Sequence, residues 1–288
     1  MMAATELKLN LTPDLVTCPY DIDDRRELES ELERNGQTYF DKEEDVDEQT
    51  ELVTRYDNRN MTSDKKEVNL SLCRFHWYQI KWANVVWLFC LHTAFVWAYV
   101  HVLLWPVKMQ STIWTVLSSI FSGFGMSVGA HRFWAHRSFK ATSLLRFYLL
   151  ILQTMTINGS AFSYARDHRN HHKWPATDAD PKNPARGFFF AHIGWWMLCK
   201  RPEVVLFGRK VPIDDLHEDK MLMLQHRFYL PLVVLLAFVV PVLVPMLGWH
   251  EDLATSLALC IIRIVVVLHH LFTVNSVAHF WGYRPYNR

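Results

Sequence analysis

The sequence WANVVWLFCLHTAFVWAYVHVLLW occupies residues 82–105, and none of its 24 positions is Asp, Glu, Lys or Arg. As an α-helix this stretch would be about 36 Å long, which exceeds the roughly 30 Å of a bilayer's hydrocarbon core. An uncharged segment of this length is typical of a transmembrane helix. Residues 82–105 therefore predict an integral membrane protein.

Three further stretches repeat the pattern at residues 112–130, 228–249 and 253–274, and Arg263 is their only charged residue. Short turns follow the first and third of the four stretches. We therefore predict an all-α integral membrane protein with four transmembrane helices in two hairpins. Gly125 and Gly129 predict close helix packing against the second span.

Two shorter apolar stretches, residues 144–157 and 187–197, are not predicted to cross the membrane. The first has 14 residues and contains Arg146, so it is too short to span the hydrocarbon core. If it crossed, the histidines before and after it would lie on opposite sides of the bilayer. We expect both stretches at the membrane interface.

The charges divide the chain into an acidic N-terminal part and a basic remainder. Residues 1–75 carry 19 Asp and Glu against 10 Lys and Arg, whereas the rest of the chain carries 10 against 20. We expect residues 1–67 to form a mostly disordered cytosolic tail and residues 68–288 to form the membrane domain. A basic membrane domain suits membrane lipid and acidic ligands, and the sequence contains no nucleic-acid-binding motif.

Basic residues in the loops predict the orientation of the four spans. The loop at 131–227 is rich in Lys and Arg, whereas the turns at 106–111 and 248–252 contain one Lys and no Arg. The positive-inside rule then places this loop, as a helical cap, and both termini in the cytosol.

Two groups of histidines stand in the loop at 131–227. His168, His171 and His172 have the i, i+3, i+4 spacing that places side chains on one face of a helix. His131 and His136 are five residues apart, which is roughly 140° of rotation on an ideal α-helix. Either the helix frays after Arg132, or these two residues serve two neighbouring metal ions.

A straight continuation of the fourth span would carry His279 out of the hydrocarbon, to the level that His136 reaches at the end of the second span. Asn275 lies one turn earlier and could orient this imidazole or hold a metal-bound water. Six imidazoles without cysteine suit iron, copper, nickel or zinc, and they exceed the needs of one ion. Eight of the other histidines are expected to be structural: His92, His101, His192, His217, His226, His250, His269 and His270.

These motifs resemble those of a known family, the membrane-bound acyl-CoA desaturases of the stearoyl-CoA 9-desaturase type, including its insect members. The resemblance rests on GAHRFWAHR at 129–137, ARDHRNHHK at 165–173, TDADP at 177–181, RGFFFAHIGW at 186–195 and NSVAHFWGYRPY at 275–286. It implies a multi-pass protein of the endoplasmic reticulum membrane that introduces a cis double bond at the ninth carbon of a long-chain acyl-CoA. It also implies dioxygen as oxidant and electrons from cytochrome b5 and its NADH-dependent reductase.

The resemblance assigns residues as well. It implies two Fe2+ ions ligated by six histidines, with Asn275 acting through a water and three residues contacting coenzyme A. The histidines are His131, His136, His168, His171, His172 and His279, and the coenzyme A contacts are Arg166, Asp167 and Lys200. Two other functions remain open, a membrane fatty-acyl hydroxylase and a non-catalytic desaturase paralogue.

The family's third motif, His-x-x-His-His, is expected beyond the Gly-Tyr-Arg-Pro-Tyr of residues 282–286, so residues 1–288 read as a desaturase domain truncated at its C-terminus. If residues 1–288 are the whole product, we predict that it loads iron incompletely and is inactive, because the ligands of that motif are missing. If they are part of a longer protein, we expect that full-length protein to be an ordinary desaturase. Iron analysis of the purified chain tests this expectation. Close to two irons per chain would contradict it.

Overall fold

The computed structural model describes residues 80–281, so the predicted acidic tail over 1–67 and the last seven residues lie outside the described part. Within residues 80–281 every regular element is a helix, and the only β pairing there is one isolated bridge between Ile80 and Leu198. This confirms the predicted all-α class.

Four helices are long and apolar enough to cross a membrane. The first is α4 (Trp82–Leu104), and the second runs through α5 (Met109–Phe124) into the π-helix η2 (Gly125–Ala135). The third combines α12 (Tyr229–Val233), the π-helix η5 (Val234–Val239) and α13 (Val240–Trp249). The fourth is α14 (Leu253–Asn275), which is followed by α15 (Val277–Phe280).

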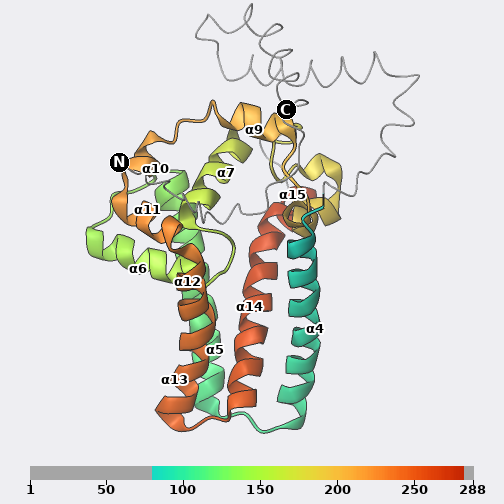
Figure 1. Cartoon of the computed structure of the whole chain (residues 1–288), viewed down its shortest axis with the longest axis vertical. Helices are drawn as coiled ribbons and strands as arrows, with labels where there is room; N and C mark the ends of the chain where they lie inside the picture. Colours follow the sequence, from blue (N-terminus) through green and yellow to red (C-terminus); the bar gives the residue numbers. More distant parts are fainter. Residues whose placement is uncertain (1–79, 282–288) are drawn as a thin grey trace, which may run out of the picture.

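The long helices stand side by side, and the short ones gather at one end of this bundle (Figure 1). Helix α14 packs against α4, α5 and α13. We call the short helices over residues 143–227 the end layer: α6 (Ser143–Thr154), α7 (Ala161–Lys173), η3 (Pro184–Arg186), η4 (Phe190–Gly194), α8 (Trp195–Met197), α9 (Pro202–Gly208), α10 (Asp214–Glu218) and α11 (Lys220–Arg227). Helix α6 lies across the bundle direction and is not one of the candidate spans.

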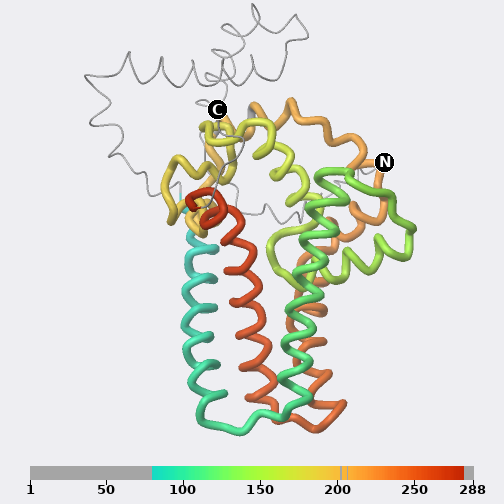
Figure 2. The backbone as a smooth tube through the Cα atoms, turned by 180° about the vertical axis from the view of Figure 1, so that it is seen from behind, coloured from blue at the N-terminus to red at the C-terminus, as the bar shows by residue number. Residues whose placement is uncertain are grey.

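At the opposite end of the bundle (Figure 2), hydrogen bonds join the turn between α4 and α5 to the turn between α13 and α14. The buried carboxylate of Glu251 accepts hydrogen bonds from the backbone N–H of Lys108, at 3.1 Å, and from the Ser111 hydroxyl. The Lys108 ammonium donates to the carbonyl of Trp249 at 2.8 Å. These contacts hold the two turns together.

Prolines in the third span free carbonyls that neighbouring helices then satisfy. Pro241 has no N–H to offer the carbonyl of Ala237, four residues earlier, and that oxygen accepts from Arg263 Nη2 at 2.6 Å. Pro245 likewise leaves the carbonyl of Pro241 unpaired along the helix, and Trp114 Nε1 donates to it at 3.3 Å. An unpaired carbonyl is costly in an apolar bundle, so these bonds connect the third span to α14 and α5.

Arg263, the charged residue in the fourth span, faces protein and is only 1% exposed. Besides the Ala237 carbonyl, its guanidinium donates a hydrogen bond to the carbonyl of Met155 at 3.1 Å. Met155 directly follows α6. One side chain therefore ties the third span, the fourth span and the end layer together. This arrangement explains how an arginine is retained in the middle of an apolar helix.

The backbone of η2 meets the backbone of α6 at Gly125. A Cβ at this position would lie 2.2 Å from the nitrogen of Gln153 and 2.4 Å from the carbonyl carbon of Leu152. At Gly129 the nearest atom, the Cβ of Leu149, would be 3.2 Å away. The close packing predicted from these two glycines is therefore made with the end layer rather than with another span.

We predict that Gly125→Ala destabilises the protein by about 1–3 kcal/mol, because the added methyl group meets backbone atoms that cannot move aside. Thermal unfolding in detergent measures the effect. Gly123→Ala is the matched control, since a Cβ there has no atom within 4 Å and alanine favours a helix by about 1 kcal/mol. Equal destabilisation by both variants would contradict the prediction.

Candidate metal centre

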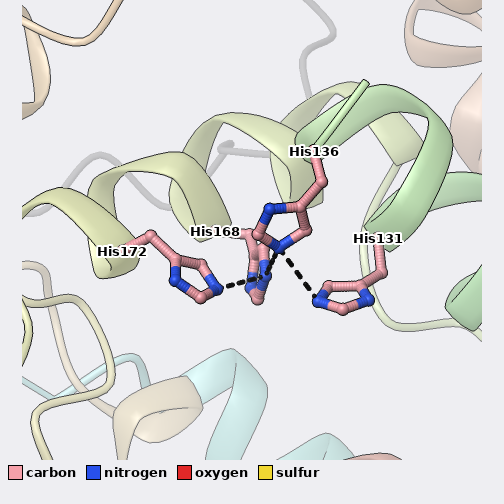
Figure 3. A group of neighbouring side chains, drawn as sticks. All are labelled: His131, His136, His168 and His172. Atoms are coloured by element: carbon pink, nitrogen blue, oxygen red, sulfur yellow. Dashed lines mark hydrogen bonds between the residues drawn. The ribbon is translucent and has the colours of Figure 1, made fainter. Parts of the chain in front are cut away.

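Four imidazoles converge where the end of η2 meets α7 of the end layer. His131 lies in η2, His136 follows its last residue, and His168 and His172 lie one turn apart on α7. One ring nitrogen of each lies within 4.8 Å of the others, and Figure 3 shows the rings turned toward one another. The Nε2 atoms of His136 and His131 are 3.1 Å apart. The Nε2 atom of His168 lies 2.9 Å from Nε2 of His136 and 2.9 Å from Nε2 of His172.

These distances match the coordination shell of a metal ion. Imidazole nitrogens bind transition metals at about 2.0–2.1 Å, so two ligands at right angles are about 3 Å apart. Among the described residues, this group contains four nitrogen donors and no carboxylate or thiolate. Such a donor set suits iron, copper, nickel or zinc.

The π-helical turn is what brings His131 and His136 together. The backbone N–H of His136 donates to the carbonyl of His131 at 3.0 Å, an i→i+5 hydrogen bond. In a π-helix residues five apart face the same side, unlike in an α-helix. The first of the two alternatives, that the helix frays after Arg132, is therefore wrong: the helix widens and continues to Ala135, and both rings can serve one site.

Arg169 fixes the end of η2 against α7. Its guanidinium donates to the carbonyls of Trp134, at 2.6 Å, and Ala135, at 3.1 Å. It also donates to both carboxylate oxygens of Asp215 at 2.8 Å. Since Arg169 follows His168 on α7, this one side chain sets the position of His136 relative to His168.

The electrostatic surroundings keep the imidazoles neutral. Burial, followed by the charges of Lys182 and the neighbouring histidines, holds the pKa of His168 far below its ordinary value. Burial and then the proximity of His136 lower the pKa of His172 to about 4. Burial and the charge of Arg169 also lower the pKa of His136. At neutral pH these rings are in the unprotonated form that binds metals.

His171 and His279 lie beside this group and form a separate pair. The two ring centroids are 5.4 Å apart. His171 Nδ1 is 2.8 Å from the fully buried carboxylate of Asp180, which leaves Nε2 available as a ligand, an arrangement common for metal-binding histidines. α14 ends at Asn275 and α15 begins after Ser276, so His279 is not carried by the straight helix that we had expected.

The three residues predicted to contact coenzyme A also lie together. Lys200 Nζ is 2.7 Å from both carboxylate oxygens of Asp167, and Arg166 Nε is 3.0 Å from one of them. Burial would raise the pKa of Asp167, but the two cations outweigh it and hold this pKa well below its usual range. Asp167 precedes His168, so the cluster adjoins the four converging histidines.

Sequence reasoning missed a hydrogen-bonded line of three histidines. His92 of α4 lies 2.9 Å from His269 of α14, whose other nitrogen lies 3.0 Å from His192 of η4. The line ends at the carbonyl of Leu88, 2.7 Å from His92, and at the hydroxyl of Ser276, 2.8 Å from His192. No spacing in the sequence signals this line, because its members are brought together only by the packing of α4, α14 and η4.

The sequence profile of the fatty acid desaturase family matches residues 111–288. The chain belongs to this family. Over 210 residues the chain is 40% identical to the Delta(9)-fatty-acid desaturase fat-6 of Caenorhabditis elegans, an alignment that covers 73% of the chain and 62% of that relative.

It is also 40% identical over 208 residues to an acyl-CoA desaturase of Ovis aries and to stearoyl-CoA desaturase 2 of Mus musculus. These alignments cover 72% of this chain and 57% and 58% of the relatives. The chain thus spans about three-fifths of the length of the curated relatives it matches.

We predict that Asp180→Asn lowers the affinity of the site for a divalent transition metal by about 10–100-fold, because the neutral amide no longer holds and polarises His171. Metal retained by the purified protein, measured by mass spectrometry, reports the effect. Asp178→Asn is the control, since that carboxylate pairs with Arg201 rather than with a histidine. Unchanged metal content in Asp180→Asn would contradict a role for His171 as a ligand.

Proposed function

We propose that this protein is a fatty acyl-CoA desaturase, which introduces a cis double bond at the ninth carbon of a long-chain acyl-CoA. The observation that carries the proposal is the convergence of His131, His136, His168 and His172 in a chain whose relatives are named Delta(9) and stearoyl-CoA desaturases. The reaction removes two hydrogens from adjacent carbons. Together with two electrons and two protons, they reduce one dioxygen to two waters.

The proposed cofactor is a pair of Fe2+ ions, which activate dioxygen when bound. The four converging histidines would hold iron at one position, with His171 and His279 as further ligands and Asn275 acting through a water. Support comes from the nitrogen-only donor set and the lowered pKa values. The buried Asp180 would keep His171 in the tautomer that presents Nε2.

The cluster of Arg166, Asp167 and Lys200 is the proposed binding site for coenzyme A. Its cations can contact phosphate oxygens, while Asp167 holds the lysine in place through two 2.7 Å contacts. Because this cluster is continuous with His168 along α7, a ligand bound there would lead its acyl chain toward the histidines. The chain's own residues thus bind one end of the substrate and orient the other.

The proposed location is the endoplasmic reticulum membrane, with the end layer and both termini in the cytosol. The four long apolar helices support a multi-pass membrane protein, and the excess of Lys and Arg in residues 131–227 supports this orientation. In that orientation the histidines face the compartment from which cytochrome b5 and its NADH-dependent reductase would deliver electrons.

The test is expression of the intact gene in a host that lacks its own desaturase, followed by analysis of fatty acids by mass spectrometry. We expect fatty acids with a double bond at the ninth carbon. His168→Ala should abolish them, because its ring lies within 3 Å of two other histidine rings.

His270→Ala, which alters an exposed histidine of α14, is the control and should leave the product unchanged. A hydroxylated chain without an alkene would instead identify a hydroxylase. If neither product forms although the protein accumulates, the non-catalytic paralogue is the better account.

A further inference from the structure

Lys182 is a buried lysine that the proposed function does not use. Its side chain is 5% exposed, and its ammonium lies over two rings, 5.1 Å from the centroid of Tyr164 and 4.8 Å from that of Trp195. Among residues 80–281, no hydrogen bond or ion pair is made by this ammonium. Only its backbone N–H is bonded, to Asp180 at 2.8 Å.

The acidic groups nearest to this ammonium already have other partners. Asp167 is bonded to Lys200 and Arg166, and Asp180 accepts from the backbone of Lys182 and lies against His171. Stacked rings offset only part of the cost of burying a cation. Burying this ammonium therefore costs free energy of folding, because none of the described residues is its counter-ion.

Lys182 carries its charge at neutral pH despite this burial. Desolvation is the largest influence and lowers its pKa to about 8, while the charges of Asp167 and Asp180 oppose it. Most of the population is thus protonated at pH 7, so the group is a hydrogen-bond donor.

Its location links the two parts of the candidate site. The ring of Tyr164, under the ammonium, stacks on the ring of His168 with centroids 5.4 Å apart and an interplanar angle of 12°. Lys182 is also close enough to Asp167 and Lys200 for their charges to act on it, and its own charge acts on His168. The ammonium therefore lies near both the converging histidines and the proposed site for coenzyme A.

We propose that Lys182 binds the thioester carbonyl oxygen of the acyl-CoA. This rests on the proposed function and deepens it. An acyl-CoA whose phosphates contact Lys200 and whose alkyl carbons reach His168 must pass its thioester between them. The carbonyl oxygen of the thioester can accept a hydrogen bond, and the ammonium of Lys182 can donate one. Among the described residues, this ammonium has no other acceptor. Bound there, the carbonyl fixes how far the chain extends toward the histidines.

The test compares two ligands that differ only in this carbonyl, stearoyl-CoA and its thioether analogue S-octadecyl-CoA. Calorimetry on the purified protein in detergent gives both affinities. We expect the wild type to bind the thioester about tenfold or more tightly than the thioether, because the hydrogen bond has a charged donor. Lys182→Met should remove this preference and leave thioether binding unchanged, and Lys182→Arg should retain part of it.

Lys140→Met is the matched control, since it removes an exposed lysine just before α6, and it should retain the full preference. The ligand-free Lys182→Met protein should also melt at a higher temperature than the wild type, because an uncompensated buried charge has been removed. A merely structural lysine would have the opposite effect on melting.

Three results would overturn the proposal. The first is a thioester preference that survives in Lys182→Met, and the second is equal binding of both ligands by the wild type. The third is equal weakening of both ligands in Lys182→Met together with a lower melting temperature. The proposed function would survive all three. If the wild type bound neither ligand, acyl-CoA itself would be the wrong substrate, and both proposals would fail.

Discussion

The convergence of the four histidines depends on one hydrogen bond, from the backbone N–H of His136 to the carbonyl of His131. It closes a π-helical turn, and this turn aligns two side chains that an α-helix would point in different directions. The widened turn needs support because its carbonyls are displaced from regular helical partners. Arg169 supplies this support by donating to the last carbonyls of η2 from the neighbouring helix α7. The same two helices carry all four converging histidines.

In the helix bundle as well, backbone carbonyls that lack a helical partner accept hydrogen bonds from side chains of neighbouring helices. Proline at 241 and 245 in the third span leaves carbonyls without helical donors, and the side chains of Arg263 and Trp114 replace those donors. Arg263 also reaches Met155, directly after α6. α6 in turn packs on the glycine face of η2, where Gly125 allows backbone contact. A continuous set of contacts therefore runs from the middle of the bundle to the helix that carries His131.

Charge is distributed unevenly around the histidines, and this affects what the site can bind. Burial keeps the imidazoles neutral, and Arg169 and Lys182 lower the pKa values of His136 and His168 further. The only carboxylate bonded directly to one of these histidines in the described part of the chain is Asp180, on His171. Neutral ligands leave a metal its full positive charge, which favours anionic or reducible oxygen species as additional ligands. The ammonium of Lys182, which has no bonded acceptor among residues 80–281, is a further group nearby that favours oxygen acceptors.

The sequence by itself determined the class of the protein, the approximate bounds of its four long helices and its family. Segment length and the absence of charge are local properties of the sequence. In lipid, a single apolar segment can bond all its backbone groups internally only as a helix. It also determined that His168 and His172 share a face, because that spacing holds for any regular helix.

Only the tertiary structure decided how His131 joins His136, because the choice between an α- and a π-helical turn depends on donors from α7. Three other features were likewise decided only by the tertiary structure. They are the break at Ser276 before His279, the line from His92 through His269 to His192, and the position of Lys182 between two rings. Each depends on side chains that are distant in the sequence, and their energies depend on burial, which no local pattern specifies.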